Sequence, residues 1–516
     1  MGGVNQSGQS RGRFRTPLIL VLLGAGCWLA WEWFPGGSPG LVERPSVSGK
    51  GGLREVYYGP PNSVAVLPFR SSASNLETAS QAEGFARELL EALIGFPALQ
   101  VTARSSSFFF RQRDGDYRII AERLQCTHLL DGEWSNGPEG VELALRLFDA
   151  RSDREIWQGL YSAPLPELLA MREDISAEVV AALPVAPQEG KRLQPLPDTQ
   201  AWKRYAEGLL HADPSAEPDL ARAADAFQAA LAIDPGFTAA RLELAQVWLH
   251  PAWIAGAEGS RAVADARALV EAVLDIDPDC ARGWALMGYI LHRHDWDWDG
   301  AAKAGRRAAG LRYGDAGILS VASLALATVG ELALAHEYLE DSVRRDPLNL
   351  GSRLRLGLLQ EFLGEFESAL ATYRQLLSMN PDYPGARAYR ARVKLLQGKT
   401  ESALREGGEE TDPFWRRYAR VLALNAQQES PEAEALMQEM IADDGSVAAF
   451  QIAEVLAFSG DRDRAFEWLE SAFEQRDAGL TSTIGNRFLE NLHTDPRWPD
   501  WSTTLGLQAH GGDEGH

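Results

Sequence analysis

The feature that most constrains this chain is a repeat with a period of 34 residues. Gly330, Gly364 and Gly398 stand 34 residues apart, and each is followed by a charged residue. The alanine five positions after each glycine keeps the same period. A fourth copy of the pattern begins at Gly460. A fixed period of this length indicates a supersecondary unit whose hydrophobic face is buried only by its neighbours, so the sequence predicts a stack of helical hairpins.

One unit can be followed from Leu350 to Pro381. Apolar residues at helical spacing lead to Gly364, which tolerates a tight turn, and a second helix carries Ala369 and Tyr373 on one face. Asn380-Pro381 ends the unit because proline cannot extend a helix. This pattern resembles the tetratricopeptide repeat. The resemblance implies about eight such units over residues 198–480, in a class of scaffold that binds other molecules and rarely catalyses.

The composition limits the class of partner. The chain has 516 residues and a formal net charge of −22. Such a charge argues against nucleic acid or an anionic membrane surface as the main partner, although simple solubility explains it equally well. The three cysteines, Cys27, Cys126 and Cys280, show no metal-binding or disulfide spacing.

The first residues predict a membrane anchor. Residues 1–16 contain three arginines and no acid, and residues 17–34 form an apolar run just long enough to cross a bilayer. Trp28, Trp31 and Trp33 gather at its far end, as in an interfacial aromatic belt. The positive-inside rule then leaves the N-terminus in the cytoplasm and places the bulk of the chain in the periplasm, outside the inner membrane.

Three other interpretations of this apolar run stay open. It could be a cleaved signal peptide, a lipoprotein signal ending at Cys27, or a buried helix. The Pro/Gly/Ser-rich residues 35–61 read as a linker.

Residues 62–184 predict a small domain of mixed helix and strand. Strands are expected at 63–69, 99–103, 127–134, 141–148 and 156–161, and helices at 83–94, 116–124 and 165–183. This order gives an α+β or α/β sandwich, followed by a Pro-rich linker at 185–197.

This domain resembles the TolB-like N-terminal domain. The resemblance rests on SVAVLPF at 63–69, FPALQVTARSSSF at 96–108, LLDGE at 129–133 and LLAMREDIS at 168–176. In bacterial signalling proteins such a domain lies between a membrane span and tetratricopeptide repeats, often behind a cytoplasmic adenylate cyclase or a winged-helix DNA-binding domain. Here only residues 1–16 precede the expected span, so the resemblance implies no effector domain. The whole fold is expected to be an α+β TolB-like domain, then an all-α superhelix with a cap and tail at 481–516.

The first helix of each hairpin is expected to line a concave groove suited to an extended peptide or a partner's helix. Basic side chains on these helices would favour an acidic peptide or a terminal carboxylate. The alternative is that they are solvated charges balancing nearby acids. The candidates are Lys203, Arg241, Arg282, Arg353, Arg355, Arg387, Arg390, Arg416 and Arg417.

Chemistry-bearing motifs are weak. His292-Arg293-His294-Asp295 could hold zinc, but it lacks a metalloenzyme frame, and a turn between two helices packed by Trp296 and Trp298 is favoured. Ser105-Ser106-Ser107 has no identifiable base. No catalytic residue, metal or cofactor is expected. Three hypotheses remain: a non-enzymatic membrane-anchored scaffold that binds a protein, a periplasmic sensory part of a signalling system, and a hydrolase with an unrecognised site.

Overall fold

A computed structural model describes residues 59–71, 75–111, 116–186, 190, 195–213, 218–250, 254, 259–312, 314–427 and 431–507. The expected membrane anchor at 17–34 and most of the linker at 35–61 lie outside these residues. Among the residues described, no helix combines the length and the apolar character that crossing a membrane requires.

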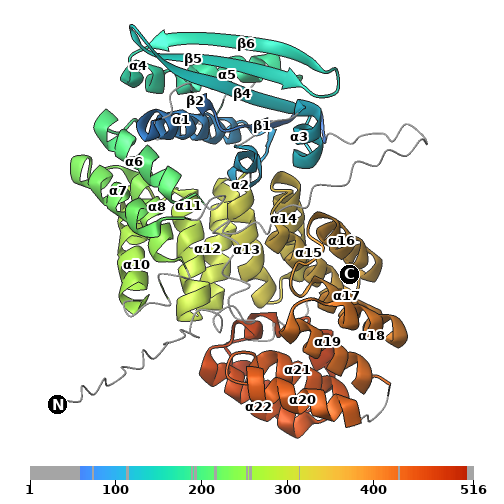
Figure 1. The fold of residues 1–516 in the computed structure, drawn as a ribbon. Helices are drawn as coiled ribbons and strands as arrows, with labels where there is room; N and C mark the ends of the chain where they lie inside the picture. Colours follow the sequence, from blue (N-terminus) through green and yellow to red (C-terminus); the bar gives the residue numbers. More distant parts are fainter. Residues whose placement is uncertain are drawn as a thin grey trace, which may run out of the picture.

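The N-terminal module is a mixed sheet with helices on its faces (Figure 1). Its strand order is β3-β1-β4-β5-β6, and the short β2 pairs with β4. The first strands run parallel, whereas β4, β5 and β6 form an antiparallel meander. The strands are β1 (Ser63–Val66), β2 (Arg70–Ser71), β3 (Gln100–Val101), β4 (His128–Gly137), β5 (Gly140–Asp149) and β6 (Arg154–Ala163).

Helix α1 (Leu76–Ile94) covers one face of this sheet with α5 (Arg172–Ala182). Phe85 on α1 packs against Trp134 on β4, with ring centroids 5.7 Å apart. Helix α3 (Tyr117–Leu124) covers part of the opposite face. The helix expected at 165–183 is two helices, because α4 (Leu165–Ala170) ends at Met171 and α5 begins directly after it.

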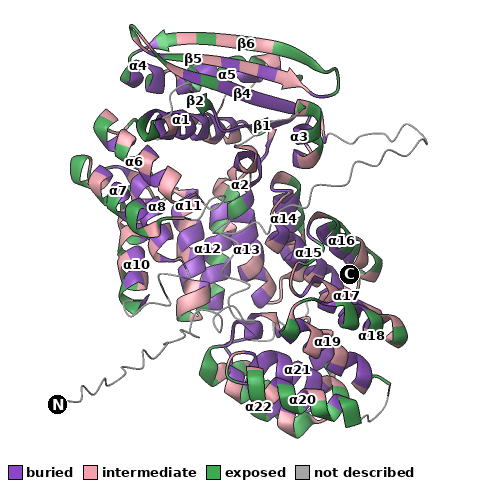
Figure 2. Cartoon of the chain, viewed as in Figure 1, coloured by how far each residue is buried: buried purple, intermediate pink, exposed green. Residues whose placement is uncertain are grey.

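Eight successive helical pairs follow within the described residues. The pairs are α6 (Thr199–His211) with α7 (Leu220–Ile233), α8 (Thr238–Trp248) with α10 (Gly259–Ile276), α11 (Ala281–Ile290) with α12 (Trp298–Leu311), α13 (Ala316–Thr328) with α14 (Leu332–Arg345), α15 (Leu350–Phe362) with α16 (Phe366–Met379), α17 (Ala386–Leu396) with α18 (Thr400–Glu409), α19 (Pro413–Asn425) with α20 (Pro431–Asp444), and α21 (Ala449–Ser459) with α22 (Arg462–Gln475). We call the first member of each pair its A helix and the second its B helix. Figure 2 shows burial concentrated along the sides on which these helices meet.

The periodic glycines explain the tight turn inside several pairs. Gly330, Gly364, Gly398 and Gly460 all have φ between +72° and +92°, where a side chain would be strained. The residue after each one donates its backbone N–H to the carbonyl five positions earlier, which closes the end of the A helix.

Other glycines let the two helices of a pair approach. A Cβ at Gly357 on α15 would lie 2.4 Å from the ring of Tyr373 on α16. A Cβ at Gly208 on α6 would lie 2.5 Å from Phe227 on α7. The absence of a side chain at these positions therefore sets the spacing between the helices.

Helix α1 also begins the helical stack. Gly84 allows it to lie against α6, since a Cβ there would come within 2.9 Å of Ala206. Trp202 on α6 donates a 3.1 Å hydrogen bond to Glu88 on α1. An end repeat of a solenoid needs a cover for its exposed face. The N-terminal module supplies this cover, as its position above α6 and α8 in Figure 1 shows.

Candidate functional site

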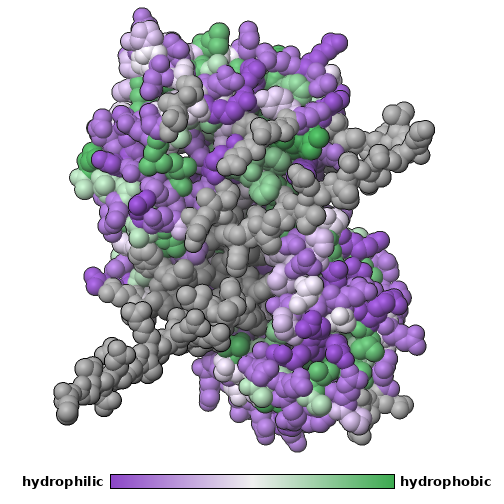
Figure 3. Space-filling view, in the orientation of Figure 1, coloured by the Kyte–Doolittle hydropathy of each residue, from purple (hydrophilic) through white to green (hydrophobic). Residues whose placement is uncertain are grey.

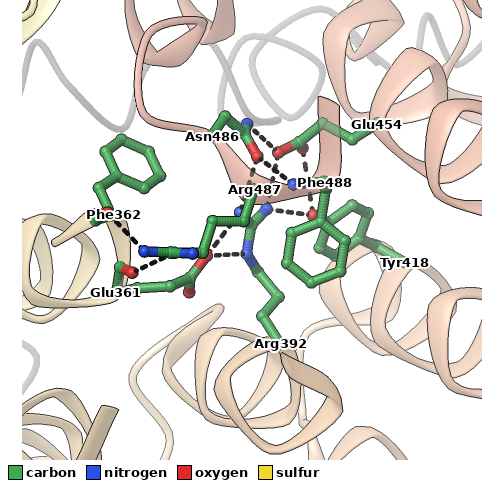
Figure 4. A network of polar contacts seen from close by, with 8 residues as sticks. All are labelled: Glu361, Phe362, Arg392, Tyr418, Glu454, Asn486, Arg487 and Phe488. Carbon is green, nitrogen blue, oxygen red and sulfur yellow. Dashed lines mark hydrogen bonds and ion pairs between the residues drawn. The ribbon is translucent and has the colours of Figure 1, made fainter. Parts of the chain in front are cut away.

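A buried charged network centred on Arg392 lies where the A helices of the last four repeats meet (Figure 4). We call the side of the repeats that these A helices line the inner face. Arg392 on α17 contacts Glu361 on α15 at 2.8 Å and Glu454 on α21 at 2.7 Å. Its Nη1 also donates a 2.5 Å hydrogen bond to the hydroxyl of Tyr418 on α19. All four side chains are buried. Four successive A helices thus converge on one guanidinium, which shows that A helices line the inside of the curve.

The C-terminal segment Ala478–Leu492 lies on this inner face. It contains the 3-10 turns η5 (Ala478–Ser482) and η6 (Arg487–Leu492) and is not part of a helical pair. Asn486 donates a 2.6 Å bond to Glu454, and Arg487 donates to the backbone carbonyls of Glu361 and Phe362. The guanidinium carbon of Arg392 lies 4.3 Å from the centre of the Phe488 ring. The inner face of the later repeats therefore already holds an irregular segment of the same chain.

The sequence predicts that the tail at 481–516 caps the last hydrophobic face. Helix α23 (Trp498–Thr504) does pack there, through Trp501 and Phe473 of α22. The preceding segment reaches much further, since Ile484 approaches Gly330 in the fourth repeat.

The charge on Arg392 is strongly fixed by its neighbours. Although burial opposes it, the carboxylate of Glu361 raises the pKa of Arg392 well above its usual range. Burial raises the pKa of Glu361 even with Arg392 beside it. Burying these ions carries a high desolvation cost, which their mutual attraction offsets. Removal of one member of the network therefore leaves a buried charge without compensation.

The nine basic residues predicted for a groove all have partners within the protein. Four of them donate to the backbone carbonyl six residues earlier, in the turn that joins one repeat to the next. These four are Arg241, Arg353, Arg387 and Arg416. In three of the four the acceptor is the proline that ends the preceding B helix, and Trp284 makes the same bond to Pro278. The spacing Pro-x5-Arg is therefore a sequence signal for a turn-closing contact.

The other five connect different elements. Lys203 lies 2.9 Å from Glu77 of the N-terminal module, and Arg282 lies 2.6 Å from Glu243. Arg355 donates to Ser320, Arg390 pairs with Glu406, and Arg417 pairs with Asp444. Arg353 and Arg355 are 4% and 7% exposed, so neither presents its guanidinium to solvent. The structure does not bring the nine together on one surface, and their role in binding a partner stays a prediction.

A second polar centre joins the N-terminal module to the repeats. Arg87 on α1 and Arg282 on α11 both contact Glu243 on α8, and both Arg87 and Glu243 are buried. Although burial alone would raise it, the two guanidinium groups lower the pKa of Glu243 to about 2. Nearby, Ser105 and Ser106 donate bonds of 2.7 and 2.5 Å to Asp346. The serine run thus has a structural partner on the repeats.

The histidine motif forms a turn, as favoured from sequence. Leu291–Asp295 is a π-helical turn between α11 and α12, and the rings of Trp296 and Trp298 lie 5.6 Å apart. His292 contacts the hydroxyl of Thr328 at 2.9 Å. No group of three or more potential metal ligands occurs among the residues that the structure covers.

Sequence reasoning did not identify Arg392, Glu454 or Asn486. Glu454 carried a usable signal, because it is the single charged residue in the mainly apolar helix 449–459 and a buried charge needs a partner. Arg392 and Asn486 had no comparable signal, since their partners are distant in sequence.

Comparison with known proteins agrees with the helical repeats. The tetratricopeptide repeat family model matches residues 350–383. A protein of Rhizobium meliloti (strain 1021) named "Putative adenylate cyclase 3" is 23% identical over 231 residues, which are 42% of this chain and 37% of that protein. The chain therefore spans little more than a third of this relative's length.

Solved structures resemble part of the chain. YrrB, described as a TPR protein with an unusual peptide-binding site, is 15% identical, with a TM-score of 0.31 over 42% of this chain and 99% of its own. PilW, described as a type IV pilus biogenesis factor, is 18% identical, with a TM-score of 0.35 over 43% and 99%. A tetratricopeptide repeat protein from Parabacteroides merdae ATCC 43184 is 14% identical, with a TM-score of 0.38 over 50% and 98%. The described residues form a mostly helical solenoid with a small sheet module, and residues 350–383 of this solenoid match the tetratricopeptide repeat.

Proposed function

We propose that the protein is a non-enzymatic scaffold whose repeats bind a segment of a partner protein. The supporting observation is the C-terminal segment on the inner face. Side chains from several A helices hold an irregular stretch there through hydrogen bonds, an ion network and the Phe488 ring. The C-terminal segment already covers this part of the inner face, so a partner segment would bind beside it, at the starts of α17 and α19, through contacts of the same kind.

The proposal includes a location and a class of partner. Residues 17–34 anchor the chain in the inner membrane, with the TolB-like module and the repeats in the periplasm. The partner segment is acidic, and no nucleic acid is bound. The partly exposed arginines at the start of α17 and α19 support an acidic ligand, because guanidinium groups bind carboxylates in two-pronged geometry. Arg387 and Arg416 each use a backbone carbonyl as an acceptor, and Glu409 lies 4.0 Å from Arg387. Both guanidinium groups retain further donors for such a ligand.

Crosslinking in intact cells, followed by mass spectrometry, tests both parts of the proposal. We expect one recurrent protein partner, with crosslinks to residues near α17 and α19, and a C-terminal tag reached only from the periplasm. The charge reversal Arg387→Glu should weaken capture of that partner. Arg374→Glu on the exposed side of α16 is the matched control, since it makes the same charge change on a B helix. If both variants captured the partner equally well, the assignment of the binding surface to the starts of α17 and α19 would be wrong.

A second candidate function is the sensory, ligand-binding part of a signalling system. The relative named as an adenylate cyclase favours it, because its similarity covers 42% of this chain. A cyclase or regulator encoded beside this protein, whose activity changes when this protein is deleted, would support that function over the scaffold.

A further inference from the structure

A cavity of about 140 Å³ lies between the N-terminal module and the repeats. Helices α1 and α2 (Arg104–Ser107) border it on one side, and α8, α11 and the start of α13 border it on the other. Figure 1 shows α2 directly above α13 at this junction. Ligand sites occur preferentially at such junctions between modules.

Three guanidinium groups line this cavity, from Arg87, Arg104 and Arg282. Arg87 and Arg282 share one carboxylate, that of Glu243. The Nη1 atom of Arg87 is buried and has no hydrogen-bond partner. Among the residues described, the side chain of Arg104 has neither a hydrogen bond nor an ion pair, although Glu243 attracts it at longer range. Donors therefore exceed acceptors at this wall of the cavity.

The acidic residues around the cavity are already engaged. Glu91 lies 2.9 Å from Arg312. Asp315 accepts from the backbone N–H groups of Gly317 and Ile318 at the start of α13. Asp346 accepts from Ser105 and Ser106. Each of these carboxylates has a partner of its own, and although Glu91 also attracts Arg87, none of the three forms an ion pair with Arg104.

The charge on Arg104 is therefore poorly compensated. Burial, followed by the neighbouring charge of Arg87, lowers the pKa of Arg104 to about 10. An arginine is ordinarily protonated far above this range. A negative group placed between Arg104 and Arg87 would remove the repulsion between them and satisfy the buried Nη1 atom.

We infer that this cavity binds a small anion of the carboxylate or phosphate class, with Arg104 and Nη1 of Arg87 as its donors. The size of the cavity limits the ligand, because a cavity of about 150 Å³ accommodates a molecule such as benzene. Inorganic phosphate and a short dicarboxylate both satisfy this limit. The inference does not depend on the scaffold proposal, since the cavity lies away from the inner face of the later repeats.

The test measures the thermal unfolding midpoint of the full chain in mild detergent. Sodium phosphate and sodium succinate are titrated separately, with sodium chloride at equal ionic strength as the reference. We expect a saturable rise of the midpoint with phosphate, with succinate or with both. The anion that saturates at the lower concentration identifies the ligand class.

Two variants separate binding from folding. Arg104→Ala should unfold at the same temperature as the wild type or higher without the anion, because it removes an uncompensated charge. The same variant should bind the anion at least about tenfold more weakly, since a charge-assisted hydrogen bond is lost. Arg154→Ala, on the exposed edge strand β6, makes the same charge change and should bind as the wild type does. The absence of a saturable rise in the wild type, or an equal rise in all three proteins, would overturn the inference.

Discussion

The side-chain amide of Asn486 donates a 2.6 Å hydrogen bond to Oε1 of Glu454, and the same oxygen accepts a 2.7 Å bond from Arg392. One carboxylate thus joins the C-terminal segment to the A helices of two repeats. The repeats and the segment depend on each other, because neither can satisfy these buried groups alone. The inner face of the later repeats is consequently a part of the folded core and not an open groove.

Arg392→Met should strongly destabilise the protein. The substitution leaves Glu361 and Glu454 buried without their cation, and breaking a buried ion network by removing one partner costs about 3–5 kcal/mol. Urea unfolding followed by circular dichroism measures this loss. In the triple variant Arg392→Met, Glu361→Gln, Glu454→Gln the uncompensated charges are gone, so much of the stability should return. A single variant as stable as the wild type would contradict the role given to this network.

Phe488→Ala should release the C-terminal segment from the inner face. Phe488 is 1% exposed and packs on Arg392 and Phe458, and truncation of a buried phenylalanine costs about 3–5 kcal/mol. Limited proteolysis should then cut between Ala478 and Leu492 much faster than in the wild type. Glu490→Ala is the control in the same segment, because its exposed side chain should change stability by no more than about 0.5 kcal/mol. Equal cleavage of Phe488→Ala and wild type would show that the segment is held by other contacts.

The helical pairs could be predicted from the sequence because the residues that determine them are close together in the chain. Gly364 has φ of +80° where the period predicts a turn, and Tyr373 fills the space opposite Gly357. Apolar spacing and turn residues carry this information over a few positions. Five of the six strands of the N-terminal module could be predicted for the same reason, but the two-residue strand β2 was not predicted. The break at Met171 was missed because apolar spacing continues through it.

The partners of charged residues could not be predicted in the same way. Arg392 and Asn486 are 94 residues apart, and Ser106 and Asp346 are 240 residues apart. Periodicity places each residue on a helix or in a turn, but it does not say which distant element will face it. The sequence therefore does not distinguish an arginine that binds a partner from one that stabilises the fold, when both lie on A helices. The Pro-x5-Arg spacing is the exception, since both groups lie in one turn.

The exposed surface also does not indicate where a partner binds. The face in Figure 3 is mainly hydrophilic over the described residues, with apolar residues in separated patches. The large exposed apolar side chains are scattered over several elements, and Leu160 on β6 is the most exposed of them at 77%. Scattered exposure of this kind is normal for a folded protein and identifies no interface by itself.

Gly357→Ala should destabilise the protein although alanine is the better helix former. The added methyl would lie 2.4 Å from the Tyr373 ring, and overpacking of this kind costs about 1–3 kcal/mol. Gly408→Ala is the matched control, because a Cβ there meets nothing within 4 Å near the end of α18. Removal of that glycine should raise stability by up to about 1 kcal/mol. Thermal unfolding should therefore move in opposite directions for the two variants, and a common direction would contradict the packing role of Gly357.

His292 should make the protein less stable as the pH falls below neutrality. Burial, followed by the charges of Arg293 and Arg355, lowers the pKa of His292 to about 3, whereas an unfolded histidine titrates near about 6.5. Below about pH 6.5 the imidazole of His292 is therefore protonated in the unfolded chain but neutral in the folded protein. This difference lowers the free energy of unfolding by up to about 1.4 kcal/mol per pH unit, until the pH reaches the pKa of the folded state. Above that range His292 is neutral in both states and contributes no pH dependence.

His292→Gln keeps a group able to bond Thr328 but cannot titrate, so its urea unfolding free energy should fall less steeply between roughly pH 6.5 and 4.5. His294 titrates in both proteins, so the difference between the two slopes isolates His292, and equal slopes would show that His292 is not held neutral in the folded state.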